Sequence, residues 1–297
     1  MKWIFLFIIL TFYVSFPVWA LAIDPGTVTG TLIIDQDEIV LKHAYAHLHD
    51  NAEGWLDWSE EMRILLTDRE VSQKALAGLN PVFTLSEMLK QDKLRGVLLR
   101  FNPAAPNTVV ITVLYPPKAP CESLANKLLS DNGRSPIDRL MINDLRVSGA
   151  IKQHADGNKE LGVPAEDYSA RFSAPLFKEL PVTSDLRGKK VLQSPQVVAL
   201  LTKYAAMAKG DLKKVRQYST DRSNREIDTN LSRMDEEAMP VIGQMAIEQE
   251  QRIKRGPLRL IVRGNKATLI VGPANGKSMM GFVKEEDIWK SEYGMAF

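Results

Sequence analysis

Alternation of apolar and polar residues dominates the first half of the chain. Between Gly26 and about Phe177 the two kinds of side chain alternate with period two, and turn residues separate the runs. Successive side chains of a β-strand point to opposite faces, so the pattern predicts an antiparallel β domain with one buried face. The predicted strands are Thr27–Ile34, Glu38–Leu48, Met62–Thr67, Arg95–Phe101, Thr108–Leu114, Asp144–Gln153 and Tyr168–Pro175. Short helical insertions are expected between Glu70 and Leu94, with a break at Asn80-Pro81.

Helical spacing replaces this alternation after Ser194. Ser194 is a favourable N-cap, and Pro195 is a favourable first helical residue. The apolar residues that then share one helical face are Val197, Leu200, Leu201, Tyr204, Ala205 and Ala208. Gly210 predicts the end of this helix, and Asp211 can cap a second, shorter one.

The last third of the chain predicts a long helix and then strands. Helical spacing extends from Ile227 to Arg255, and Pro240 is expected to kink or interrupt it because proline lacks an amide hydrogen. The predicted strands are Leu258–Arg263, Lys266–Val271, Met279–Lys284 and Ile288–Tyr293. Gly264-Asn265 joins the first two as a hairpin turn. Helices followed by a strand meander indicate helices that cover one face of a curved sheet.

The two patterns divide the chain into two predicted domains. Residues 23–180 form the β-rich domain, residues 181–193 a polar linker and residues 194–297 a helices-on-sheet domain. The overall fold class predicted is therefore α+β.

The first 22 residues have the pattern of a cleavable signal peptide. Lys2 precedes an apolar run from Trp3 to Phe16, and Ala20-Leu21-Ala22 matches a signal peptidase site. The run is shorter than the roughly 20 residues that span a bilayer, and no cysteine follows the cut to accept lipid. We therefore expect a periplasmic or secreted protein with no transmembrane segment after cleavage.

Charge and cysteine content narrow the function classes. The chain has 38 Lys+Arg and 36 Asp+Glu; without Lys2, the only charged residue of the leader, 37 basic residues remain. This balance gives no electrostatic reason to expect a nucleic-acid partner. Cys121 is the only cysteine, so no internal disulfide can form, and we interpret it as an incidental thiol.

Three histidines and a tyrosine are the sharpest local cluster. On a strand, His43, Tyr45, His47 and His49 share one face. His43 and His47 are about 13 Å apart along a strand, which is too far to share one ion. His47 and His49 can converge on copper or zinc if another strand supplies further ligands. The alternative is a strand whose polar aromatic side chains face solvent.

Other candidate sites are weaker. Basic residues gather on the predicted helices, and we expect them to lie on helix faces that contact solvent. They are Lys203, Lys209, Lys213, Lys214, Arg216, Arg252, Lys254 and Arg255. The sequence contains no phosphate-binding glycine loop, no His-Glu-x-x-His and no Gly-x-Ser-x-Gly. No cofactor is expected, and no catalytic residue is assigned.

The order of features from Ser194 to Tyr293 resembles the cone-shaped nuclear transport factor 2-like superfamily. The resemblance depends on the capped helix, the Ala208-Lys209-Gly210-Asp211 break and the terminal Trp289-Lys290 strand. It implies a concave sheet with a pocket, where members of the superfamily bind ligands, bind proteins or catalyse reactions. The candidate lining residues are Tyr204, Tyr218, Met280, Phe282 and Trp289. The first half also resembles the β domains of exported bacterial proteins, which implies no activity.

Three functions follow as hypotheses. The first is a non-catalytic envelope protein that binds a small molecule or another envelope protein. The second is an enzyme that uses carboxylates in the C-terminal pocket; a buried Asp or Glu there favours it over binding. The third is metal binding through His43, His47 and His49.

Overall fold

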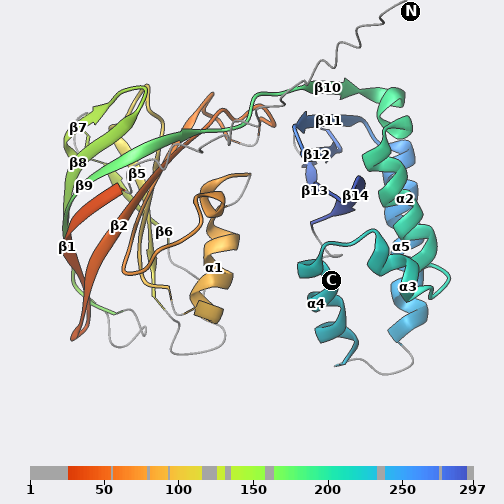
Figure 1. The fold of residues 1–297 in the computed structure, drawn as a ribbon, viewed down its shortest axis with the longest axis horizontal. Helices are drawn as coiled ribbons and strands as arrows, with labels where there is room; N and C mark the ends of the chain where they lie inside the picture. Colours follow the sequence, from red (N-terminus) through yellow and green to blue (C-terminus); the bar gives the residue numbers. More distant parts are fainter. Residues whose placement is uncertain are drawn as a thin grey trace, which may run out of the picture.

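The computed structural model describes residues 26–54, 56–78, 81–92, 94–115, 126–130, 135–157, 164–232, 238–273 and 276–292. Within them the chain has a mixed α+β fold with one large sheet, one small sheet and several helices (Figure 1). The signal peptide and Cys121 lie outside the described residues. Among the helices that are described, none combines the length and apolar character needed to cross a membrane.

The large sheet has nine strands in the order β6-β5-β4-β3-β2-β1-β9-β8-β7. Their bounds are β1 Gly26–Ile34, β2 Asp37–His49, β3 Glu61–Thr67, β4 Gly96–Phe101, β5 Thr108–Leu114, β6 Asn126–Ser130, β7 Asp138–Ile142, β8 Arg146–Ala155 and β9 Glu166–Lys178. All adjacent pairs are antiparallel, and β2 also meets the end of β9 in parallel. The seven predicted strands are confirmed within a few residues, while β6 and β7 were not predicted.

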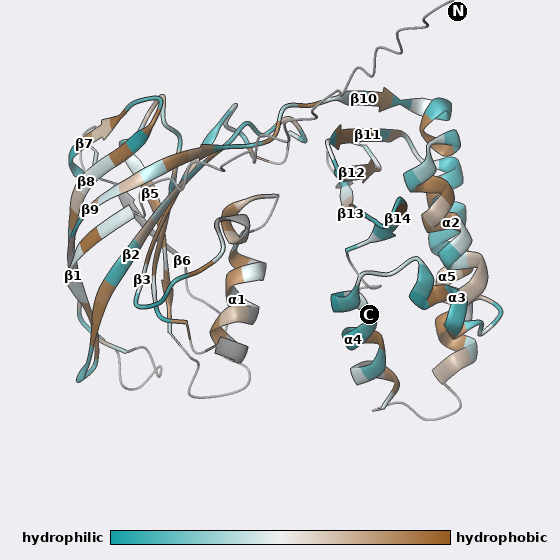
Figure 2. Ribbon diagram, in the orientation of Figure 1, coloured by the Kyte–Doolittle hydropathy of each residue, from teal (hydrophilic) through white to brown (hydrophobic). Residues whose placement is uncertain are grey.

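The large sheet curls around one apolar core. Inward residues of β1 to β5, β8 and β9 pack into a single buried cluster, with Leu32, Ile64, Leu99 and Ile111 fully buried. Brown and teal positions alternate along these strands in Figure 2, as the period-two pattern predicts. The apolar face of each strand therefore points into the curl.

The opposite, outer face carries a second and smaller apolar cluster. The 3₁₀ helix η1 (Gln73–Leu76) and the helix α1 (Pro81–Asp92) lie over β2 to β5. Leu85 and Leu89 of α1 pack there against Leu65 and Leu98 of the sheet. In Figure 1, α1 lies on the side of the large sheet that faces the small sheet.

Two glycines allow a close approach between strands. A Cβ at Gly30 would lie 2.1 Å from the Ser169 carbonyl oxygen, and one at Gly26 would lie 1.9 Å from the Ala44 carbonyl oxygen. The register of β1 on β2 shifts between Thr27 and Gly30. Only glycine fits these positions, so they fix how β1 enters the sheet.

The second half begins with the predicted capped helices. α2 spans Pro195–Met207, and the Ser194 Oγ accepts the Val197 N–H at 3.4 Å. α3 spans Leu212–Gln217, and the Asp211 carboxylate accepts the Lys214 N–H at 3.0 Å. Both predicted N-caps are confirmed.

The helical stretch expected from 227 to 255 is interrupted, but Pro240 does not lie at the interruption. Two helices occupy this region, α4 Asp221–Leu231 and α5 Ala238–Arg255. Pro240 is the third residue of α5. In the first turn of a helix an amide hydrogen has no intrahelical acceptor, so proline costs little there and causes no kink.

The small sheet has the order β10-β11-β12-β13-β14. Its strands are β10 Ser184–Arg187, β11 Leu258–Arg263, β12 Lys266–Val271, β13 Ser278–Glu285 and β14 Ile288–Ser291. Gly264 has φ of +60° in the predicted hairpin turn between β11 and β12. β10 and the 3₁₀ helix η2 (Gly188–Gln193) fall in the segment predicted as a polar linker.

The small sheet packs on helices around its own core. Val197 and Leu200 of α2 and Ile253 of α5 are buried against Leu260 and Leu269 of the sheet. This core shares no residue with the core inside the large sheet.

Candidate functional site

The outer face of β2 carries buried aromatic and imidazole side chains towards the end of the strand. Tyr45 packs under the α1 layer, and its hydroxyl accepts the Val71 N–H at 3.0 Å. Two residues further, His47 is 4% exposed and His49 is 1% exposed. The expectation of a solvent-facing histidine strand is therefore wrong for these two residues, because other segments cover this end of the strand.

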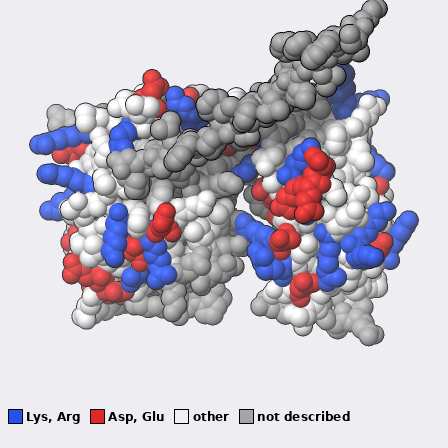
Figure 3. Space-filling model, viewed as in Figure 1, with Lys and Arg blue, Asp and Glu red and all other residues white. Residues whose placement is uncertain are grey.

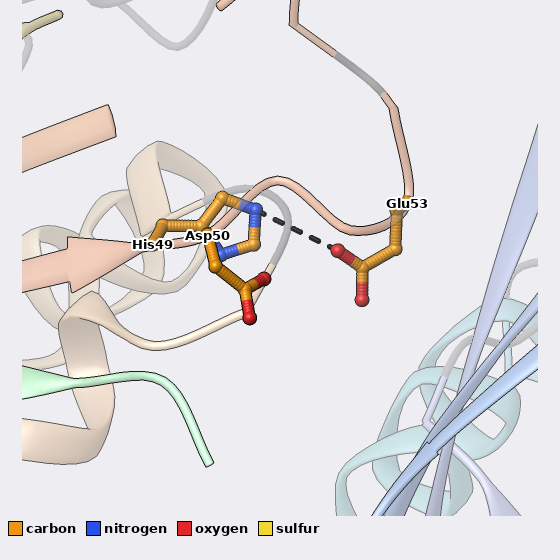
Figure 4. Close-up of side chains that lie close together, drawn as sticks. All are labelled: His49, Asp50 and Glu53. Carbon is orange, nitrogen blue, oxygen red and sulfur yellow. Dashed lines mark ion pairs between the residues drawn. The ribbon is translucent and has the colours of Figure 1, made fainter. Parts of the chain in front are cut away.

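A turn after β2 brings acidic groups over His49. Asn51 has φ of +45°, and its side chain accepts the Leu56 N–H at 3.1 Å and donates to the Leu56 carbonyl at 2.9 Å. The turn places the Asp50 and Glu53 side chains beside the His49 ring (Figure 4). Glu53 is only 4% exposed.

The end of β9 supplies a third carboxylate. The Glu179 N–H donates to the Leu48 carbonyl at 3.0 Å, which places Glu179 next to the end of β2. Its Oε2 lies 3.0 Å from His49 Nδ1 and 3.6 Å from His47 Nε2. One carboxylate therefore serves both histidines.

The small sheet supplies the balancing cation. Arg263, the last residue of β11, donates to both carboxylate oxygens of Asp50 and, at 2.5 Å, to the Leu180 carbonyl. Its Nε lies 3.5 Å from Glu53 Oε1. Lys277 of the small-sheet region also donates to the Gly54 carbonyl. We call His47, His49, Asp50, Glu53, Glu179 and Arg263 the charged cluster; it joins the large sheet to the small one.

Burial and neighbouring charges set the protonation states in the charged cluster. Burial lowers the pKa of His47 to about 4, although the Glu179 charge opposes the shift. Burial alone would raise the pKa of Glu179, but the hydrogen bond from His49 and the nearby cationic groups lower it to about 2. At neutral pH, His47 is therefore neutral and Glu179 is ionised.

A second buried ion pair lies beside the charged cluster on the outer face. Arg63 is fully buried, and its Nε donates to Glu61 Oε2 at 2.7 Å. Its Nη1 donates to the carbonyls of Leu76 at 2.8 Å and Gly78 at 2.5 Å, at the end of the η1 segment. This arginine anchors the η1 loop, and nothing in the local sequence pattern predicted it.

The five residues proposed to line a C-terminal pocket lie in or near the small core. Tyr204 and Phe282 are buried in it, and Met280 and Trp289 are partly buried against it. The Tyr204 hydroxyl contacts Met280 Sδ at 3.8 Å. Tyr218 is of intermediate exposure. Four of the five, all but Tyr218, therefore belong to or pack against the small core.

Lys203 is buried, although the sequence predicts that it lies on a solvated helix face. It is 1% exposed, and its Nζ donates to Ser291 Oγ of β14 at 2.7 Å. Burial lowers its pKa to about 8, against the opposing charge of Glu226. The expectation of solvation is wrong here because β14 covers this side of α2.

An open groove of about 740 Å³ lies elsewhere on the large sheet. Side chains of β1, β8 and β9 that point away from the core line it, including Thr29, Lys152, Ser169 and Arg171. Polar and apolar groups contribute to its floor in similar measure. Sequence reasoning missed this groove, because it forms from strands about 140 residues apart that only the sheet order brings together.

The groove borders an edge strand with exposed apolar residues. Within the described residues β7 is the last strand of the large sheet, and Asp138 at its start contributes to the groove. Met141 is 65% exposed, Ile142 is 39% exposed, and Leu145 in the following turn is 78% exposed. Apolar side chains on an unpaired strand edge are a feature that most proteins avoid unless a partner covers them.

Basic and acidic side chains are mixed over both parts of the face drawn in Figure 3, with no extended surface of one sign.

Comparison with known proteins finds no relative: no protein family, no curated protein sequence and no solved structure matches this chain.

Proposed function

We propose that this protein is a non-catalytic, exported protein of the bacterial envelope that binds another protein along the outer face of β1, β8, β9 and the edge strand β7. The leader-like residues 1–22 support export. The proposal includes two domains, residues 23–180 and 194–297, with the second resembling the cone-shaped nuclear transport factor 2-like superfamily.

The observation that carries the proposal is the joint position of the groove and the exposed edge. Small-molecule sites are usually enclosed, whereas this groove is open, and polar and apolar groups share its floor. An edge strand can pair with an extended segment of a partner through main-chain hydrogen bonds. Met141 and Leu145 provide apolar contacts along the edge, and Lys152 and Arg171 of the groove can pair with acidic residues of that segment.

The alternative of a carboxylate enzyme in the C-terminal part has less support. Among the described residues from 194 to 292, the buried polar side chains are Ser194, Gln196, Lys203, Ser219, Thr220, Ser223, Arg263 and Ser291. A catalytic carboxylate in the small core would need to be buried there. Binding is therefore the function that the arrangement favours.

Charge reversal in the groove tests the proposal. The double variant Lys152→Glu/Arg171→Glu changes two exposed side chains, so the fold is expected to stay intact. After chemical cross-linking in cells, the native protein should carry a partner that this variant loses at least tenfold. The matched control Lys209→Glu/Lys213→Glu, on exposed positions near α3, should keep it. Equal cross-linking by both variants contradicts the proposal.

A further inference from the structure

We propose that His49, Glu53 and Asp50 bind a divalent transition-metal ion of the Zn²⁺ type. One ligand atom from each of these residues lies within 4.8 Å of the other two. Figure 4 shows the His49 ring facing Glu53, with the Asp50 carboxylate beside it. One imidazole nitrogen and carboxylate oxygens form a donor set that zinc accepts, with water to complete the shell.

The proposal rests on a buried carboxylate oxygen. Among the residues that the structure describes, none donates a hydrogen bond to the buried Glu53 Oε2, which lies 3.8 Å from His49 Nε2. This distance exceeds the range of about 2.7–3.2 Å for a hydrogen bond between nitrogen and oxygen. Two ligands on one zinc ion are roughly 3.3 Å apart, given metal–ligand distances of about 2.0–2.2 Å and tetrahedral angles. A shift of about half an ångström lets both atoms bind one ion.

The orientation of the His49 ring points to the same conclusion. Nδ1 lies 3.0 Å from Glu179 Oε2, so the other ring nitrogen, Nε2, is the one that faces Glu53 Oε2. A metal ion between Nε2 and Oε2 would bind both atoms, while Glu179 holds the ring in this orientation.

Neighbouring groups hold the proposed ligands as second-shell partners do at metal sites. Glu179 fixes the His49 ring, and Arg263 together with the Ala52 N–H fixes the Asp50 carboxylate. The carboxylates of Asp50, Glu53 and Glu179 gather around Arg263, and a divalent cation compensates such a group of buried acidic side chains. His47 lies outside the group of three, so the site differs from the His47/His49 pair expected from sequence.

Zinc titration of the purified protein tests the site. Calorimetry or equilibrium dialysis with Zn²⁺ should give one ion per chain, and Glu53→Gln should weaken that uptake at least tenfold because it removes a charge with little change in shape. His47→Gln should change it by less than about threefold. His154→Gln is the matched control, since His154 is an exposed histidine 3.2 Å from Asp156.

Thermal unfolding separates loss of the site from loss of the fold. Zinc should raise the Tm of the native protein and of His154→Gln, but not that of Glu53→Gln. Asp50→Asn provides a second variant if Glu53→Gln fails to fold, because the Asp50 side chain is 40% exposed and tolerates change; it should also bind at least tenfold more weakly. No uptake by the native protein, or equal uptake by the folded Glu53→Gln or Asp50→Asn variant, overturns the proposal.

Discussion

The charged cluster and the Lys203 site both bury charge, but they stabilise it in different ways. In the charged cluster, Arg263 meets Asp50 and lies 3.5 Å from Glu53. Lys203 has a hydroxyl as its hydrogen-bond acceptor, that of Ser291 at 2.7 Å. An opposite charge compensates for lost hydration far better than a hydroxyl does, which explains why the pKa of Lys203 falls to about 8.

The difference has a structural origin. The charged cluster lies between two sheets, so each sheet can contribute groups of opposite sign. Lys203 lies between a helix and the last strand of the small sheet, inside a single apolar core. A charge between two sheets can therefore be paired with an opposite charge from the other sheet. A charge inside a single core is stabilised only by the few polar atoms near it.

Removing the cation of the charged cluster is expected to lower the free energy of unfolding more than the other changes considered below. Arg263→Met leaves Glu53 buried without its nearest arginine, so we expect it to lower the free energy of unfolding by about 3 kcal/mol or more. Arg259→Met removes an arginine of the same strand that pairs with the more exposed Asp185, and about 1 kcal/mol or less is expected. Urea unfolding of both variants with a chelator present measures the difference. If the two variants lose the same free energy of unfolding, Arg263 does not stabilise the buried carboxylates as described.

Titration of Lys203 is expected to change the free energy of unfolding by a smaller amount. Its pKa is about 8 in the folded protein and 10.5 without burial, so the unfolded chain binds more protons between these values. The free energy of unfolding therefore rises with pH in this window, by about 2 kcal/mol between pH 7 and 9.5. Lys203→Met should lack this rise. Urea unfolding at both pH values checks it, and parallel pH profiles for the two proteins would show that Lys203 is not the cause.

Removing the hydroxyl that accepts the hydrogen bond of Lys203 is expected to have the smallest effect on stability. Ser291→Ala removes the hydroxyl that accepts the lysine proton, and about 1–2 kcal/mol of stability should be lost at pH 7. At pH 9.5 the loss should shrink, because the neutral amine needs the acceptor less. A loss that is the same at both pH values would indicate that only packing had changed.

Much of the fold could be predicted from local pattern. The alternation of β1 to β5, β8 and β9 and the caps at Ser194 and Asp211 all follow from neighbouring residues. β7 escaped prediction because it is mostly exposed on both faces and shows no alternation. β10 escaped because it has four residues and only one apolar side chain, Leu186, which is too little to show alternation.

The candidate sites depend more on distant residues. Alternation places His47 and His49 on one face, but their acidic partner Glu179 is 130 residues from His49, and Arg263 is 213 residues from Asp50. Local spacing cannot reveal such neighbours. Lys203 shows the same limit, since helical periodicity indicates which face is apolar but not which strand will cover a charged position.

Site-specific photo-crosslinking in cells tests the proposed binding surface most directly. A photoreactive residue at Thr29, Lys152 or Arg171 of the groove should give a discrete cross-linked partner, and one at Lys209 or Lys213 should not. Adducts confined to the groove positions are the expected result. Adducts that are absent from all three groove positions, or equally strong at the two control positions, contradict the account.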